Sequence, residues 1–143
     1  VPGDVMMSSV MSYDGMSKIG SMLGAGSVIV MDDTTCMVKT LERIAEFYYE
    51  ESCGQCTPCR EGTGWLYRVV KRIVHGEGTQ EDLDRLLAVA NNISGNTICA
   101  LGEAAATPVL SFIKHFEEEF QYHIDHKCSM VSSSNTSEGQ VAL

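Results

Sequence analysis

Residues 53–59 read CGQCTPC, which places the thiols of Cys53, Cys56 and Cys59 at intervals of two intervening residues. Gaps of this length allow one looped segment to direct three sulfur atoms at a common centre. An iron–sulfur cluster presents its iron atoms in different directions, and cysteine thiolates are their usual ligands. The segment therefore predicts a metal-binding loop, and the rest of the sequence must supply a fourth ligand and a scaffold.

Apolar residues recur at helical spacing on both sides of the metal-binding loop, which predicts four amphipathic helices. Short connections between such helices indicate a mainly α-helical fold, with a four-helix bundle over residues 34–127. Threonines that precede helices and glycines that follow them set the expected limits. These limits are a start at Thr34 or Thr35, a second helix over Thr63–His75, a third from Thr79 to Gly95, and a fourth capped by Thr107 with Pro108 in its first turn.

Cys99 is the candidate for the fourth ligand. It falls in the connection between the third and fourth predicted helices, which in an up-and-down bundle lies at the same end as the metal-binding loop. In bacterial ferredoxins the fourth cysteine of the local run follows after three more residues, but Thr63 occupies that position here. The sequence therefore predicts a [4Fe–4S] cluster on Cys53, Cys56, Cys59 and Cys99.

Zinc and disulfides are the alternative uses of the six cysteines. Zinc usually takes two separated pairs of ligands, and no second Cys or His lies close to Cys99 in the sequence. Disulfide frameworks are typical of exported proteins, and the start of the chain shows no export signal. A zinc-stapled, non-catalytic interaction module stays open as the less favoured interpretation.

Several other groups are given structural interpretations. Cys36 is expected to be a packed small residue, Cys128 an exposed thiol, and His123 and His126 part of a solvated helix end. Arg60 is expected to place positive charge beside the cluster, which favours its reduced state.

The segments outside the predicted bundle differ from it in composition. Residues 1–33 contain two strand-like stretches, Val5–Met11 and Val28–Met31, separated by a turn-forming region at Gly20–Gly26. We interpret residues 1–33 as the end of a β-containing domain and the chain as a piece of a longer one. Residues 128–143 are poor in apolar side chains and are expected to form a disordered tail.

Charge and hydropathy exclude two classes of partner. The formal net charge is −9, whereas binding to nucleic acid requires clustered Lys and Arg. No apolar run approaches the roughly 18 residues of a membrane span. We therefore expect no nucleic-acid partner and no direct membrane insertion.

The stretch ESCGQCTPCREG at residues 51–62 closely resembles the iron–sulfur signature of one family. This family is the NADH- and flavin-binding subunit of respiratory NADH:quinone oxidoreductase (complex I), together with the diaphorase subunits of NAD-linked hydrogenases and formate dehydrogenases. Residues 20–24 (GSMLG), 28–32 (VIVMD) and 97–103 (TICALGE) resemble the same family.

The resemblance implies a specific role for this chain. A [4Fe–4S] cluster on the four cysteines would accept electrons from flavin mononucleotide (FMN) reduced by NADH, and relay them to the next Fe–S cluster toward quinone. It also implies that residues 1–33 end a β-grasp domain and that Ala100 and Leu101 face the flavin. The implied partners are other peripheral-arm subunits of complex I, including neighbouring Fe–S subunits. The implied location is the cytoplasmic side of the inner membrane, or the mitochondrial matrix in a eukaryote.

The sequence departs from the family in one respect. The family's Gly-rich FMN and NADH sites lie in an N-terminal α/β domain, and no strand–turn–helix phosphate loop is recognisable here. We therefore expect this chain to be an incomplete enzyme. The same role in an NAD-linked hydrogenase or formate dehydrogenase is the alternative function.

Overall fold

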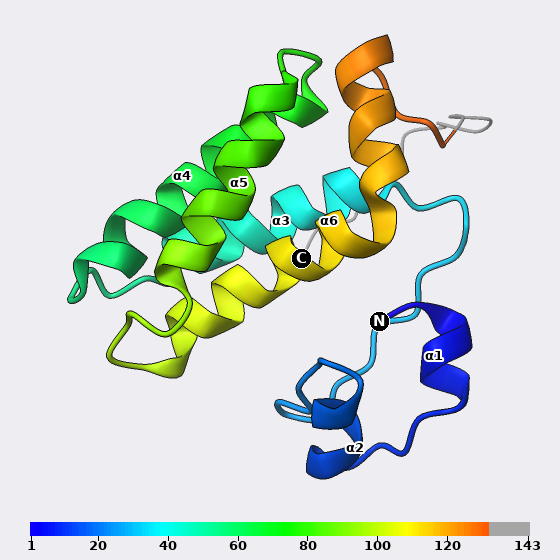
Figure 1. The fold of residues 1–143 in the computed structure, drawn as a ribbon, viewed down its shortest axis with the longest axis vertical. Helices are drawn as coiled ribbons and strands as arrows, with labels where there is room; N and C mark the ends of the chain where they lie inside the picture. The colour runs from blue at the N-terminus through cyan, green and yellow to red at the C-terminus, as the bar shows by residue number, and fades with distance from the viewer. Residues whose placement is uncertain (132–143) are drawn as a thin grey trace.

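The computed structural model describes residues 1–131, which contain helices and no strands (Figure 1). The prediction of a mainly α-helical fold is confirmed in this form. No helix in this part of the chain has both the length and the apolar character needed to cross a membrane. The helices are α1 (Gly3–Met7), α2 (Tyr13–Lys18), α3 (Met37–Glu50), α4 (Thr57–Val74), α5 (Gln80–Ile93) and α6 (Ala100–His126).

Helices α3, α4, α5 and α6 pack on one another around a shared apolar core. Each helix contributes the apolar face that its periodicity predicts, so burial of these faces is the main stabilising contribution. The fully buried side chains of the core include Val38 and Leu41 from α3, Val70 and Ile73 from α4, Leu86 and Ala90 from α5, and Ala106 and Phe120 from α6.

Helix α5 matches its prediction closely, because its start is specified by local contacts. Thr79 is the N-cap, and its backbone N–H donates to Oδ2 of Asp82 at 2.9 Å. The Asp82 side chain is fully buried and also accepts from the guanidinium groups of Arg72 and Arg85. An acidic side chain in the first turn also favours the positive end of the helix dipole.

Helix α4 begins at Thr57, with Cys56 as its N-cap, so the predicted start at Thr63 was wrong. Pro58 is tolerated because the first-turn N–H groups of a helix lack intrahelical partners. Gly62 and Gly64, which favour a loop by propensity, lie inside the helix at positions of close packing. Tertiary contacts thus override the local preference.

Helix α6 begins at Ala100, with Cys99 as its N-cap, so the predicted cap at Thr107 was also wrong. Thr107 lies within the helix, and its Oγ1 donates to the carbonyl of Glu103 at 2.8 Å. Pro108 is tolerated inside because Ala105, Ala106 and Val109 around it are buried in the core. The helix bends at Phe116, where φ is −131° and ψ is 29°, and its direction changes there in Figure 1.

The predicted start of the first bundle helix at Thr34 or Thr35 is close to the observed one, because the N-cap of α3 is Cys36. The strands predicted at Val5–Met11 and Val28–Met31 are wrong. The first stretch is partly helical, and the second is irregular, with Ile29 81% and Val30 88% exposed. A strand forms only where a neighbouring strand satisfies its backbone, and none is available among the described residues.

Helices α1 and α2 stand apart from α3–α6 in Figure 1, and no helix–helix packing joins the two groups within residues 1–131. The turn-forming character of Gly20–Gly26 is confirmed, because Gly20, Gly24 and Gly26 all have positive φ. Of the predicted tail at residues 128–143, residues 132–143 lie outside the described residues.

Candidate metal centre

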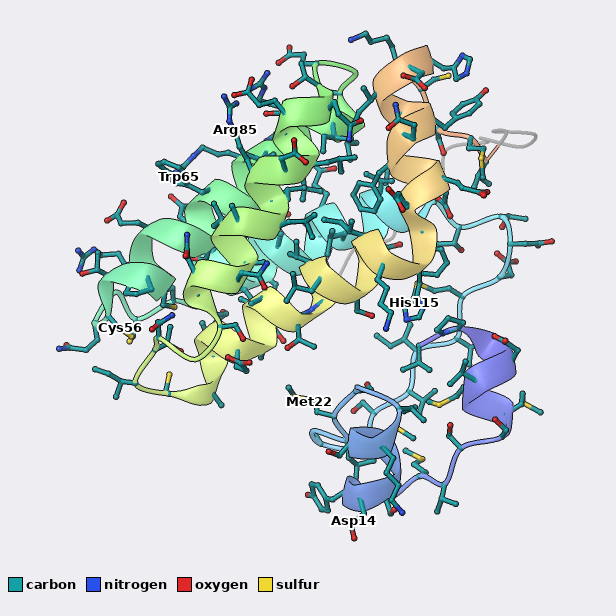
Figure 2. The ribbon with its side chains drawn as sticks, viewed as in Figure 1. Asp14, Met22, Cys56, Trp65, Arg85 and His115 are labelled. Carbon is teal, nitrogen blue, oxygen red and sulfur yellow. The ribbon has the colours of Figure 1, made fainter. Side chains whose placement is uncertain are left out.

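The three cysteines of the metal-binding loop are graded in exposure from solvent to core. Cys53 is exposed in the loop after α3, Cys56 is half-buried at the N-cap of α4, and Cys59 is 5% exposed in the first turn. Gly54 between them has a φ of +75°, a conformation that favours glycine and turns the loop sharply. Figure 2 shows Cys56 at one end of the helical assembly.

Cys99 lies at the same end. It is exposed and forms the N-cap of α6, and Figure 1 shows the loops that precede α4 and α6 together at this end. The predicted topological relation between these two loops is therefore present. Ala100 and Leu101 follow as the first residues of α6, the first exposed and the second half-buried. Their orientation toward a flavin stays a prediction.

Close packing at two glycines holds this end together. A Cβ added at Gly62 in α4 would lie 2.7 Å from both Cγ1 and Cδ1 of Ile93 in α5. A Cβ added at Gly102 in α6 would lie 2.4 Å from Cγ2 of Thr97 in the preceding loop. The first turn of α4 therefore lies against the last turn of α5, where the loop that carries Cys99 begins.

Glu103 fastens the loop before Cys99 to the first turn of α6. Its carboxylate accepts from Oγ of Ser94 at 2.6 Å and from the backbone N–H of Gly95 at 2.9 Å. The hydrogen bond from Ser94, followed by that from Gly95, lowers the pKa of Glu103 from its ordinary value of 4.5. Sequence reasoning missed this residue, because it has no role in the cysteine pattern; an acid in the first turn of α6 was the available signal.

Arg60 closes the metal-binding loop. Its guanidinium Nη1 donates to the carbonyl of Gly54 at 3.0 Å, and its Nε contacts Oε1 of Glu61 at 3.0 Å. The predicted positive charge is thus present beside the loop, but an adjacent carboxylate offsets it. Because the side chain is half-exposed, water screens the pair further.

Ser52 is a second residue that sequence reasoning missed. Its Oγ lies 3.2 Å from Sγ of Cys59 and 3.4 Å from the backbone N of Gly54. A serine directly before the first cysteine gives no signal of this contact by itself, because the contact depends on the turn at Gly54.

The donor set fits an iron–sulfur cluster. All six cysteines are free thiols. Cys56 and Cys99 occupy helix N-caps without using their side chains as caps, so both thiols remain available beside the positive ends of α4 and α6. That placement favours thiolates and a negatively charged group. Within residues 1–131, no three Cys, His, Asp or Glu side chains form a group that would hold a single metal ion.

The residues outside the cysteine pattern agree only in part with expectation. Cys36 is buried, and Cys128 and His126 are exposed, as predicted. The expected solvated position of His123 was wrong, because this side chain is 1% exposed and its Nε2 lies 3.2 Å from Sγ of Cys36. Burial, followed by the positive charge of Lys39, lowers the pKa of His123. The bend at Phe116 directs this last part of α6 against the start of α3.

Comparison with known proteins gives consistent results. The sequence profile of the NADH-ubiquinone oxidoreductase-F iron–sulfur binding region matches residues 39–123. An F-type subunit of NADH-quinone oxidoreductase from Rhizobium meliloti (strain 1021) is 50% identical over 125 residues, which are 87% of this chain and 29% of that protein. The F-type subunit from Mycobacterium tuberculosis (strain ATCC 25618 / H37Rv) is 48% identical over 80% of this chain and 26% of its own length.

A solved structure shares the fold. The crystal structure of NAD+-reducing [NiFe]-hydrogenase in the H2-reduced state aligns with a TM-score of 0.67 and 33% identity, over 69% of this chain and 17% of that one. The chain thus spans less than a third of the proteins that it matches. The match of the profile over residues 39–123 covers α4, α5 and the four cysteines. The chain therefore belongs to the family of the NADH-ubiquinone oxidoreductase-F iron–sulfur binding region.

Proposed function

We propose that this chain is the electron-transfer part of an NADH dehydrogenase flavin subunit, with Cys53, Cys56, Cys59 and Cys99 as the ligands of a [4Fe–4S] cluster. The observation that carries the proposal is the meeting of two cysteine-bearing loops at one end of α3–α6 (Figure 1). Bound there, the cluster would supply one-electron transfer between FMN reduced by NADH and the next cluster toward quinone.

The protein's own residues would bind, orient and partly shield that group. Cys59 offers its sulfur from a buried position, whereas Cys53 and Cys99 are exposed and keep one side of the site accessible. Glu103 and Arg60 hold the two loops through hydrogen bonds to backbone and side-chain groups of each loop. Ala100 and Leu101, next to Cys99, are the residues that we place toward the flavin.

We also propose the finer organisation of the chain. Residues 34–127 would be the Fe–S-binding four-helix bundle, supported by the shared core of α3–α6. Residues 1–33 would be the C-terminal end of a β-grasp domain, which is consistent with apolar side chains left exposed where partner strands are absent from the described residues. Partners would be other peripheral-arm subunits, including Fe–S subunits, in an assembly peripheral to the inner membrane.

A related function is the alternative. The fold similarity to an NAD+-reducing [NiFe]-hydrogenase favours a place in a diaphorase of that class. Co-purification from the source cell separates the two, because one assembly would bring hydrogenase subunits and the other quinone-reducing subunits.

Metal analysis of anaerobically prepared protein tests the cluster. We expect about four irons and four sulfides per chain and a paramagnetic signal on reduction. Substitution of Cys99 by Ser should lower the iron content, whereas Cys128→Ser is the matched control and should leave it unchanged. Stoichiometric zinc without iron or sulfide would refute the proposal and favour a zinc-stapled module.

A further inference from the structure

A hydroxyl group lies against one of the four candidate cluster ligands. Oγ of Ser52 is 3.2 Å from Sγ of Cys59, which is within hydrogen-bonding range for sulfur. Ser52 itself is half-buried, and Cys59 is 5% exposed. Among the described residues, Cys59 is the one candidate ligand whose sulfur has a side-chain hydrogen-bond partner.

The direction of this hydrogen bond follows from what each atom has to offer. A cysteine bound to iron is a thiolate without a proton, so its sulfur only accepts. Oγ of Ser52 accepts from the backbone N–H of Gly54 at 3.4 Å, which leaves the hydroxyl proton free to donate elsewhere. The serine therefore donates to the sulfur of Cys59 when the cluster is bound.

Burial makes this contact matter more at Cys59 than it would at the other ligands. Water can donate to the exposed sulfurs of Cys53 and Cys99, whereas a buried sulfur depends on donors from the protein. Hydrogen bonds in surroundings of low dielectric constant are also electrostatically stronger than in water. Arg60, the nearby cation, is half-exposed and paired with Glu61, which weakens its effect.

We propose that Ser52 is a positioning residue whose hydroxyl hydrogen bond to Cys59 raises the reduction potential of the cluster. The inference rests on the proposed function. Reduction adds one electron, taken from the donor, and this electron increases the negative charge on the sulfurs without transfer of a proton. A hydrogen-bond donor stabilises the more negative state, so the reduced form gains more than the oxidised form.

A redox titration of the chain with its cluster, followed by the paramagnetic signal of the reduced state, tests the inference. Ser52→Ala should keep about four irons and lower the equilibrium constant for reduction three- to tenfold. For one electron this is a shift of about 30–60 mV to more negative potential. Ser52→Thr, which retains the hydroxyl, should stay within twofold of the unsubstituted chain.

The control removes a hydroxyl that is equally close in sequence to a ligand. Thr57 directly follows Cys56, is exposed, and has no side-chain hydrogen bond within the described part of the chain, so Thr57→Ala should leave the potential unchanged. A fully loaded Ser52→Ala variant with an unchanged potential would overturn the inference. Loss of iron from this variant would also overturn it, because the serine would then serve assembly. Failure of the unsubstituted chain to hold iron would instead refute the proposed function.

Discussion

The contact between Gly62 and Ile93 gives a prediction about how the two cysteine-bearing loops are held together. A methyl group at residue 62 would lie 2.7 Å from two carbons of Ile93, which is 1% exposed. A side chain this deeply buried has little room to move aside. Gly62→Ala should therefore force the first turn of α4 away from the last turn of α5.

The magnitude comes from two opposing effects. Overpacking of a dense core typically costs about 1–3 kcal/mol. Replacement of glycine by alanine within a helix favours folding by about 1 kcal/mol. The net expectation is a loss of about 0–2 kcal/mol in the free energy of unfolding. Because the distortion occurs between the two loops, we also expect a lower iron content.

Chemical denaturation under anaerobic conditions, combined with iron analysis, measures both effects. Gly64→Ala is the matched control in the same helix, because its added methyl group would meet the ring edge of Tyr49, a side chain that is 42% exposed and able to move. This control should cost less than Gly62→Ala. A stabilisation of about 1 kcal/mol by Gly62→Ala would refute the reasoning, since an unobstructed helical glycine responds in that way.

A double substitution provides a second test of the same contact. Ile93→Ala alone should cost about 2–5 kcal/mol, because it leaves a cavity in the core. In the Gly62→Ala/Ile93→Ala variant, the new methyl group enters the vacated space, so the double variant should be more stable than the sum of the single effects predicts. Additive effects would show that the two positions do not meet.

Three further predictions concern charged and titratable groups. The lowered pKa of Glu103 means that its contribution is complete above about pH 4.5 and lost as pH falls through its folded-state pKa; Glu103→Gln should therefore be less stable at pH 7, and the difference in urea denaturation should shrink in acid. The pKa of His123 is lowered from 6.5, so the unfolded chain takes up its proton first and stability falls as pH drops below about 6.5; His123→Gln should flatten this dependence, and an unchanged slope would contradict it. Asp82→Ala removes the acceptor at the start of α5 and should cost about 1–3 kcal/mol in thermal or urea unfolding, whereas exposed Asp84→Ala should cost much less.

Local sequence signals predicted the parts of the fold that local contacts determine. Helix α5 is the clearest case, because Thr79 and Asp82 cap it and its apolar stripe is uninterrupted. The starts of α4 and α6 were misplaced for the opposite reason. Gly62 in α4 and Pro108 in α6 each disfavour a helix locally, and only packing against the other helices explains why the helices continue through them.

The candidate metal centre divides in the same way. Cys53, Cys56 and Cys59 follow from spacing alone, and Cys99 follows once the bundle topology is assumed. Ser52 and Glu103 could not be found from the sequence, since their partners are fixed by the turn geometry of the two loops. The burial of His123 depends on the bend in α6, which no residue near Phe116 predicts.

The bent course of α6 connects two distant parts of the molecule through one element. Its first residue follows Cys99, and the part beyond the bend carries Glu119, whose carboxylate accepts from the backbone N–H of Met37 at 3.0 Å. From Ala100 to Phe116 the helix rises about 24 Å. Insertion or deletion of one residue in that stretch would rotate one end against the other by about 100°. The number of residues between the cysteine and the bend therefore sets the relative orientation of the two ends, and changes in chain length are accommodated in the loops instead.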